Sequence, residues 1–249
     1  MKTLALVLVL LNLGLACLAL QCSVVPGSLK QIDAGNGQVF GVNSKDEIFT
    51  LYSKGWVQVP GSLKHVSVGP AGVWGVDSDN YIFRLQRGDW TVFPGLLKQV
   101  DAGGVTSPAG VNMYDDIYCL PGDEGATWIS LPGKLKYYSC GPYSCWGVNS
   151  ADNIYIMKEV TQTSCGGSLK WEQIPGSLSM VEVSTDGKVY GVNSNGDMYE
   201  REGISSSSPS GTKWRQIQLR QRIKHISYDL GHLWLITSND SIMDCTENQ

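Results

Sequence analysis

The 249-residue chain repeats one short phrase along most of its length. Pro-Gly-Ser-Leu-Lys occurs at 26–30 and again at 60–64, and variants of it begin at Pro94, Pro132 and Pro175. These prolines are 34, 34, 38 and 43 residues apart. A chain with such a period is built from similar units, each of which buries its apolar face on its neighbours. The repeat therefore constrains the fold more than any other feature does.

Two further phrases follow each copy of the first one. The second is Gly-Val-Asn-Ser or a close variant, and the third is a short apolar segment such as Glu-Ile-Phe, followed after a variable loop by a tryptophan. The tryptophans of the five complete copies are Trp56, Trp90, Trp128, Trp171 and Trp214. A degenerate sixth copy runs from about residue 217 to residue 249 and lacks both the proline and the last tryptophan.

Each copy contains four short apolar segments separated by glycine, proline, asparagine or aspartate. The first two segments, as at 29–35 and 38–44, alternate with the period of a β-strand. No segment beyond residue 19 sustains a helical period. Four strands per copy and six copies predict an all-β, six-bladed β-propeller. A β-sandwich is the alternative, but a sandwich does not require six copies of one phrase.

The start of the repeat region indicates how the ring closes. In four copies a tryptophan lies four positions before the next proline, and Cys22 takes that position before Pro26. The sixth copy lacks its last strand, and Cys245 follows its third strand. We therefore expect residues 21–25 to complete the sixth blade, and a Cys22–Cys245 disulfide to close the ring.

Residues 1–19 have the layout of a secretory signal peptide, with one charge at Lys2, a long apolar run and then small residues. This predicts a secreted, extracellular protein with a single propeller domain at 20–249. A membrane anchor is the alternative because of the length of the run, but no basic flank follows it. The sequon Asn-Asp-Ser predicts an N-glycan on Asn239.

The six cysteines beyond residue 19 predict three disulfides, because an even number is typical of secreted chains. Many pairings are open to six cysteines. Cys140 and Cys145 flank the turn between the first two strands of the fourth copy, where they should face each other across a hairpin. With these two and the ring-closing pair assigned, Cys119 is left to pair with Cys165, which would tie neighbouring blades at their outer edges.

The stretch Ser-Cys-Gly-Pro-Tyr-Ser-Cys-Trp at 139–146 permits three other interpretations. A cysteine-protease nucleophile needs a histidine base, but the three histidines all occupy strand positions of the repeat. A zinc site needs further ligands at suitable spacing, and the sequence places none there. A redox pair does not suit a position that is used for packing. We therefore expect a disulfide here and no metal site.

On these residues, the chain resembles the tectonin β-propeller family. The repeat Leu-Lys-x-Val-Ser-Val-Gly-x-x-x-Val-Trp-Gly-Val-x-Ser recurs in phase in six copies over residues 22–245, and the layout is similar to that of the fish-egg lectins. The resemblance implies a multivalent lectin of innate or egg defence that works without a cofactor. Its expected ligands are N-acetylglucosamine and bacterial surface glycans of the lipopolysaccharide or peptidoglycan type.

Two sets of loops are expected to share one face of a propeller: the loops that enter the first strands and the turns between the second and third strands. Adjacent blades would place the lysines of the first set near the turns of the second set. Their amides and cations would fix sugar hydroxyls, and neighbouring aromatic rings would supply an apolar surface. The sugar-binding candidates from these loops are Asn43, Asp77, Asn149, Asn193, Lys30, Lys64, Lys98 and Lys136. Trp74 and Trp146 are aromatic candidates, with packing between blades as the alternative. The five last-strand tryptophans, Trp171 among them, are expected to serve packing, since every blade needs one. The Asn and Asp side chains have an alternative role too, which is to cap their own turns.

Charge and motif patterns argue against several other functions. The net charge is −4, and no cluster of Lys and Arg could neutralise a nucleic-acid backbone. A glycosidase needs a unique pair of carboxylates, whereas the acids here recur in turns, so we expect no enzyme. The acidic turns lack the ligand spacing of a calcium loop. We expect no membrane insertion beyond the leader, and a homo-oligomer is compatible with the sequence. A protein-interaction scaffold is the alternative function.

Overall fold

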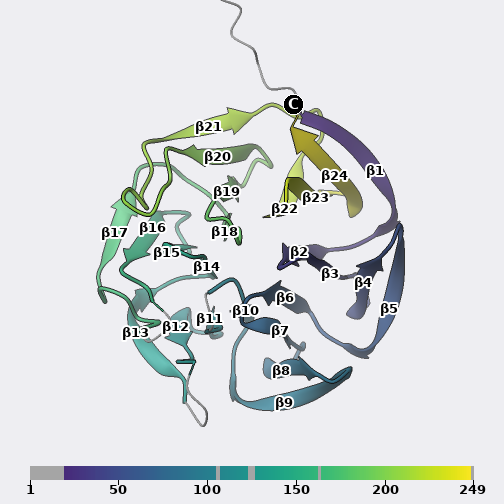
Figure 1. Ribbon diagram of the computed structural model, residues 1–249, viewed down its shortest axis with the longest axis horizontal. Coiled ribbons are helices and arrows are strands. Elements are labelled where there is room, and N and C mark those ends of the chain that lie inside the picture. The colour runs from purple at the N-terminus through teal and green to yellow at the C-terminus, as the bar shows by residue number, and fades with distance from the viewer. Residues whose placement is uncertain (1–19, 105–106, 123–126, 162–163, 248–249) are drawn as a thin grey trace, which may run out of the picture.

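The computed structural model describes residues 20–104, 107–122, 127–161 and 164–247. These residues form twenty-four β-strands and no helix, so they contain no helix long and apolar enough to span a membrane. The strands make six four-stranded antiparallel sheets around a central axis (Figure 1). This is the six-bladed propeller predicted from the repeat. The predicted signal peptide at 1–19 lies outside the described residues.

Each blade uses its strands from the axis outward. The innermost strands are β2 (Gln31–Gly35), β6 (His65–Gly69), β10 (Gln99–Asp101), β14 (Tyr137–Cys140), β18 (Met180–Val183) and β22 (Ile223–Asp229). The second strands are β3 (Gln38–Val42), β7 (Gly72–Val76), β11 (Ala109–Val111), β15 (Ser144–Val148), β19 (Val189–Val192) and β23 (His232–Thr237). The third strands are β4 (Glu47–Tyr52), β8 (Tyr81–Gln86), β12 (Asp116–Cys119), β16 (Ile154–Lys158), β20 (Met198–Glu202) and β24 (Ser241–Glu247). The outermost strands are β5 (Gly55–Ser62), β9 (Asp89–Leu96), β13 (Ile129–Lys134), β17 (Trp171–Ile174), β21 (Lys213–Ile217) and β1 (Leu20–Ser28).

We number the blades by their innermost strands, so β2–β5 form blade 1 and β22–β24 belong to blade 6. The first strand of the chain completes blade 6, because β1 pairs with β24 in the sheet order β1-β24-β23-β22. Cys22 lies directly opposite Cys245 in this pairing, and the two form a disulfide. The ring is therefore closed by the N-terminal strand and a covalent bond, as predicted.

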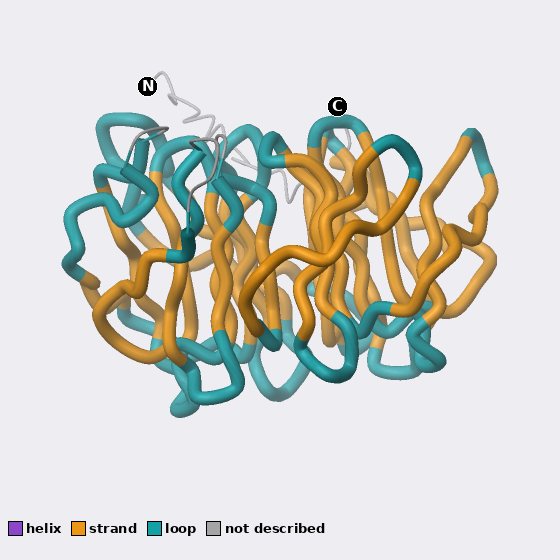
Figure 2. The backbone as a smooth tube through the Cα atoms, turned by 90° about the horizontal axis from the view of Figure 1, so that it is seen from below, coloured by secondary structure: helices purple, strands orange, loops and turns teal. Residues whose placement is uncertain are grey.

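Because the strands alternate in direction, the loops divide between two faces of a disc (Figure 2). We call one of them the entry face. It carries the loops that enter the innermost strands and the turns between the second and third strands. The opposite face carries the remaining hairpin turns and loops.

One backbone hydrogen bond recurs at all six blade boundaries on the entry face. In each, the turn between second and third strands contains a residue in the left-handed region, such as Asp46 with φ 63°, and its carbonyl accepts the N–H of a residue at the start of the next blade. The six bonds are Leu63 N to Asp46 O, Leu97 N to Asn80 O, Leu135 N to Asp115 O, Leu178 N to Asp152 O, Ile223 N to Gly196 O and Leu29 N to Asp240 O, at 2.9–3.1 Å. Asp, Asn and Gly tolerate this backbone conformation best, which explains the composition of the turn.

The glycine of the second phrase is required by close packing. A Cβ on Gly41 would lie 2.6 Å from a Leu29 methyl carbon and 2.9 Å from the Gln31 carbonyl oxygen. Leu29 is almost fully buried, and its counterparts in the other blades are buried too. A side chain at this position would therefore displace the apolar core between the strands.

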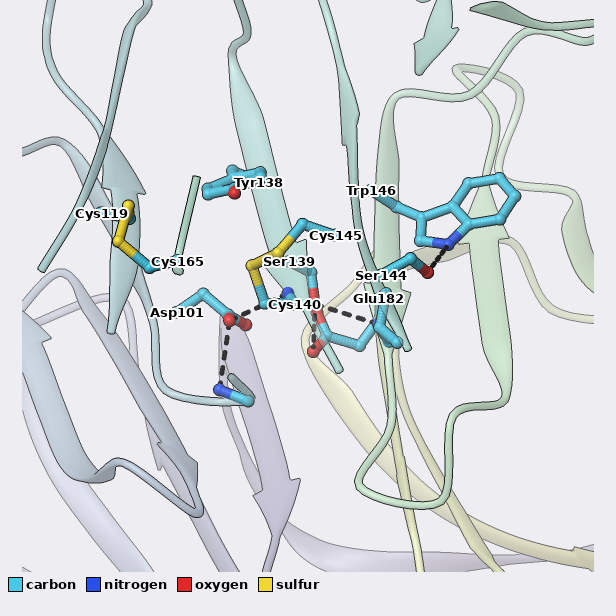
Figure 3. The surroundings of a disulfide bond; sticks show 12 residues. Asp101, Cys119, Tyr138, Ser139, Cys140, Ser144, Cys145, Trp146, Cys165 and Glu182 are labelled. Atoms are coloured by element: carbon cyan, nitrogen blue, oxygen red, sulfur yellow. Dashed lines mark hydrogen bonds between the residues drawn. A yellow bond between two sulfur atoms is a disulfide. The ribbon is translucent and has the colours of Figure 1, made fainter. Parts of the chain in front are cut away.

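The innermost strands carry an alternating ring of acids and serines around the axis. Its members, in blade order, are Asp33, Ser67, Asp101, Ser139, Glu182 and Ser227, all of them buried. They connect neighbouring blades: the Val68 N–H donates to Asp33 at 2.7 Å and the Cys140 N–H donates to Asp101 at 3.0 Å. Asp101 and the Ser139–Glu182 pair lie close to the Cys140–Cys145 disulfide (Figure 3).

The disulfides are the three that the sequence predicted. Cys140 and Cys145 are directly opposite each other in the β14–β15 hairpin, with their Cα atoms 4.0 Å apart. Cys119 in β12 of blade 3 pairs with Cys165, which follows β16 of blade 4. This bond was expected at the outer edge, but both of its cysteines are buried in the apolar core between the two blades.

Candidate functional site

A groove opens on the entry face between blades 3 and 4. Its volume is about 270 Å³. The lining combines apolar, aromatic and polar side chains, namely Ile117, Gly133, Lys134, Leu135, Asn149, Tyr155 and Trp171. A small groove with aromatic walls and few polar groups is typical of a site for a small ligand.

Trp171 is fixed in this groove by the Pro-Gly phrase of the repeat. Its indole N–H donates to the Pro132 carbonyl at 2.7 Å. Gly133 has a φ of 95°, and a Cβ there would lie 3.2 Å from the Trp171 ring. The Pro-Gly pair therefore brings the backbone against the indole and leaves a half-buried aromatic surface at the blade boundary.

Asn149 shapes the turn and keeps a free donor. Its Oδ1 accepts the N–H groups of Ala151 and Asn153, at 3.0 and 2.9 Å. Its Nδ2 makes no hydrogen bond with the described residues, and Asn149 is half-buried at the groove. The Tyr155 hydroxyl likewise has no partner within the described part of the chain. The groove therefore offers a donor and a hydroxyl beside aromatic rings.

The same repeat positions recur in the other blades, but their polar groups are already engaged. The Nδ2 atoms of Asn43, Asn112 and Asn193 donate to the carboxylates of Glu47, Asp116 and Asp197 four residues later, at 2.6, 3.1 and 3.1 Å. Blade 2 has Asp77, which has no amide donor and accepts the N–H groups of Asp79 and Tyr81. In blade 4 the fourth residue is Asn153, so Asn149 has no such acceptor.

The candidate lysines lie near the predicted turns, but within their own blades rather than across to an adjacent one. The carboxylates of Asp46, Asp115 and Asp152, in the left-handed turn positions, bind Lys30, Lys98 and Lys136 in that order. Lys64 donates to the Asn80 amide oxygen at 2.5 Å, and burial lowers its pKa. These ion pairs tie the loop at the start of each blade to that blade's turn.

The two tryptophan candidates are buried between blades. Trp74 is 2% exposed and its indole N–H donates to the Ala71 carbonyl at 2.8 Å. Trp146 is 0% exposed and donates to the Ser144 hydroxyl at 3.0 Å. Neither ring has a face open to solvent, so both serve packing in this structure and neither is kept in the site proposed below.

A larger cleft of about 1010 Å³ lies on the opposite face of blade 5. Several of its charged groups already have ion-pair or hydrogen-bond partners. Arg215 binds both Glu200 and Glu202, and Lys188 donates to the Tyr228 hydroxyl at 3.0 Å. We therefore place the primary candidate site in the groove beside Trp171, where polar groups are free.

The sequence reasoning missed the aromatic lining of this groove. Trp171 was assigned to packing alone, and Tyr155 was not singled out. The signal was present, because an aromatic residue recurs at the third position of five third-strand phrases and a tryptophan follows each of them. Among the described residues, no cluster of three or more His, Cys, Asp or Glu side chains could hold a metal ion.

Comparisons with known proteins agree with the repeat and the fold. A family model described as the Tectonin domain matches residues 28–238. A fish-egg lectin of Cyprinus carpio is 59% identical over 234 residues, which cover 91% of this chain and 98% of that protein. Among solved structures, a gluconolactonase from Xanthomonas campestris aligns with a TM-score of 0.67 at 8% identity, over 92% of this chain and 89% of that one. Virginiamycin B lyase from Staphylococcus aureus aligns with a TM-score of 0.60 at 13% identity, over 92% and 99% of the two chains. At such identities the two structural likenesses bear on the fold alone.

Proposed function

The chain belongs to the Tectonin domain family, and we propose that it is a secreted, multivalent lectin that binds N-acetylglucosamine and bacterial surface glycans. The observation that carries the proposal is the blade 4 groove. It places the free Asn149 amide and the Tyr155 hydroxyl beside the Trp171 indole. A pyranose ring presents an apolar face and a rim of hydroxyls, and this groove offers a counterpart for each.

The relative from Cyprinus carpio supports a carbohydrate ligand, since it is named a fish-egg lectin and matches almost the whole chain. An acetamido sugar suits the groove because its carbonyl oxygen would accept the Asn149 Nδ2–H. Its methyl group and ring carbons would lie against the indole.

The ring architecture supports multivalency. In five blades the last-strand tryptophan packs against the glycine of a Pro-Gly pair, and this glycine has a positive φ. A half-buried indole lies at each of these boundaries. Blade 6 has Cys22 in place of the tryptophan, so its groove lacks the indole. Blade 4 is the strongest site and the others are weaker. Several weak sites on one surface raise avidity by roughly 10²–10⁴.

The disulfides support a secreted protein. The six cysteines of the described residues all form disulfides, and such bonds persist in oxidising compartments. The acids of the entry face support binding rather than catalysis, because they are engaged in ion pairs or turns. Asn239 remains the proposed glycan carrier: it is exposed, and its Nδ2 has no partner in the described chain.

Calorimetric titration with N-acetylglucosamine, galactose and mannose tests the proposal. We expect saturable heat with N-acetylglucosamine and a weaker response with the other two sugars. Asn149→Asp keeps the oxygen that caps the turn and removes the free donor. Loss of one hydrogen bond should weaken the strongest site by about threefold to tenfold.

The matched control is the Tm of Asn149→Asp, which should equal that of the wild type because Asp77 already caps the same turn in blade 2. If none of the three sugars gives a heat of binding, the lectin proposal is refuted and a protein-interaction scaffold is favoured. Equal affinity in the wild type and Asn149→Asp would remove the groove of blade 4 as the site.

A further inference from the structure

Blade 5 lacks an ion pair that four of the other five blades carry at the entry face. In blades 1, 3, 4 and 6 a lysine at the start of the blade binds an aspartate in the left-handed turn position, as in Lys30 and Asp46. In blade 5 the lysine position is Ser179 and the aspartate position is Gly196. Both members of the pair are absent together, so the space that they fill elsewhere is vacated.

The vacated space is a pocket of about 320 Å³ at the boundary of blades 5 and 6. Ser179, Asn193 and Ser194 line it from blade 5, and Arg222, Lys224 and Ser238 line it from blade 6. The lining includes no acidic side chain. Asn193 is also the blade 5 counterpart of Asn149, so the pocket adjoins the turn of blade 5 that corresponds to the groove turn of blade 4.

Blade 1 indicates which chemical group this place accepts. There the Asp46 carboxylate binds Lys30 of its own blade, and it accepts a 2.6 Å hydrogen bond from the Ser78 hydroxyl of the next blade. Ser238 is the repeat counterpart of Ser78. The equivalent position in blade 5 lacks the carboxylate, and the Ser238 hydroxyl donates instead to the Arg222 carbonyl at 3.0 Å.

Arg222 supplies an uncompensated positive charge at the pocket. Its Nη1 donates to the Asn195 carbonyl at 2.7 Å, and it forms no ion pair with the described residues. A Cβ on residue 196 would lie 2.8 Å from the Arg222 Cβ, so glycine is what lets the arginine approach. Lys224, by contrast, is paired with Asp240. The net charge offered to a ligand is therefore that of Arg222.

We propose that this pocket binds an oxyanion carried on a glycan, a phosphate or carboxylate that takes the place of the missing aspartate. The proposal extends the carbohydrate-binding function proposed above, because the sugar would lie in the adjoining groove of blade 5. A guanidinium with free donors suits such an anion, and the Ser194 hydroxyl lies in the same lining. Blade 5 thereby selects acidic glycans, whereas blade 4 binds neutral ones.

Titration with N-acetylglucosamine 6-phosphate, N-acetylglucosamine and inorganic phosphate tests the proposal. We expect one site per chain to prefer the phosphorylated sugar by about threefold to tenfold, the scale of an exposed charge-assisted contact. This preference should shrink as sodium chloride is raised, because salt screens exposed charges. Arg222→Gln should abolish it, and Arg220→Gln, which removes the same charge from the same exposed loop, should retain it.

The results separate this proposal from the lectin proposal. Equal affinity for the phosphorylated and neutral sugars, or a preference that survives Arg222→Gln, would overturn the oxyanion pocket and leave the groove of blade 4 intact. Arg222-dependent binding of the phosphorylated sugar, without any binding of the neutral sugar, would support the pocket and refute the lectin proposal. A glucuronic acid arm shows whether a carboxylate serves as well as a phosphate.

Discussion

At the residue scale, the Nδ2 of the turn asparagine is either free or hydrogen-bonded, and one neighbouring residue determines which. Asn Oδ1 caps the turn in blades 1, 3, 4 and 5, whereas Asn Nδ2 is engaged only where an acid follows four positions later. Asn149 is followed by Asn153, and Asn193 is followed by Asp197. The fourth residue after the turn asparagine thus determines whether a groove has a free amide donor.

This dependence predicts opposite effects of two substitutions. Asn153→Asp should supply the missing acceptor, capture Asn149 Nδ2 and weaken N-acetylglucosamine binding at blade 4. Asp197→Asn should remove the carboxylate acceptor of Asn193 Nδ2, leave that amide only its 3.4 Å bond to the Tyr199 hydroxyl, and strengthen binding at blade 5. Each effect should be within about tenfold, the scale of one hydrogen bond, and calorimetry would measure both. Unchanged affinity in both variants would contradict a role for the free amide.

Asp101 predicts a distinct pH dependence of stability. Burial, and next the nearby charge of Asp33, raise the pKa of Asp101 to about 8. A group whose pKa is raised on folding contributes stability that is complete below its unfolded pKa and is lost as pH rises toward 8. Asp101→Asn does not titrate, and its amide oxygen can still accept the Cys140 N–H. The Tm of Asp101→Asn relative to the wild type should therefore increase between pH 4 and pH 8.

Two buried histidines of the same inner region change the stability with pH in the opposite direction. Burial lowers the pKa of His65 to about 4 and that of His225 to about 3, so their contribution is lost as pH falls below 6.5. The wild type and Asp101→Asn both carry these histidines, so the difference in Tm removes the histidine contribution. A difference that stays constant from pH 4 to pH 8 would contradict the raised pKa.

At the scale of strands and turns, the sequence was enough to predict the fold but not enough to predict the candidate site. The in-phase phrases predicted six blades, the closing strand and the cysteine pairs, because each feature follows from alignment of one copy on another. The lysine partners were assigned to the wrong blade, because the left-handed turn position of Asp46 and its counterparts brings each carboxylate to the lysine of its own blade. The free amide of Asn149 could have been read from residue 153, but the groove beside it depends on how Gly133 meets Trp171 in space.

At the scale of the whole molecule, the ring is held by contacts between neighbours and by one covalent closure. The six entry-face hydrogen bonds and the inner ring of acids and serines are each repeated around the axis. The Cys22–Cys245 bond joins residues 223 positions apart, whereas Cys140 and Cys145 are only 5 apart. The entropy that a disulfide removes from the unfolded chain grows with this separation.

The two disulfides should therefore differ in their effect on stability. Replacing Cys22 and Cys245 by serine should lower the free energy of unfolding by about 5 kcal/mol, and replacing Cys140 and Cys145 by valine by about 2 kcal/mol. Valine is the residue that blade 2 uses at the latter two positions, as Val68 and Val73. Urea denaturation would measure both changes. A larger loss in the hairpin variant would contradict the closure account.

The central claim is that sugars bind in the grooves between blades, and a crystal structure of the complex with N-acetylglucosamine tests it most directly. We predict that the sugar lies in the blade 4 groove, with its ring against Trp171 and its acetamido oxygen within hydrogen-bond distance of Asn149 Nδ2. A sugar bound only in the large cleft on the opposite face, or at the buried positions of Trp74 and Trp146, would contradict the account.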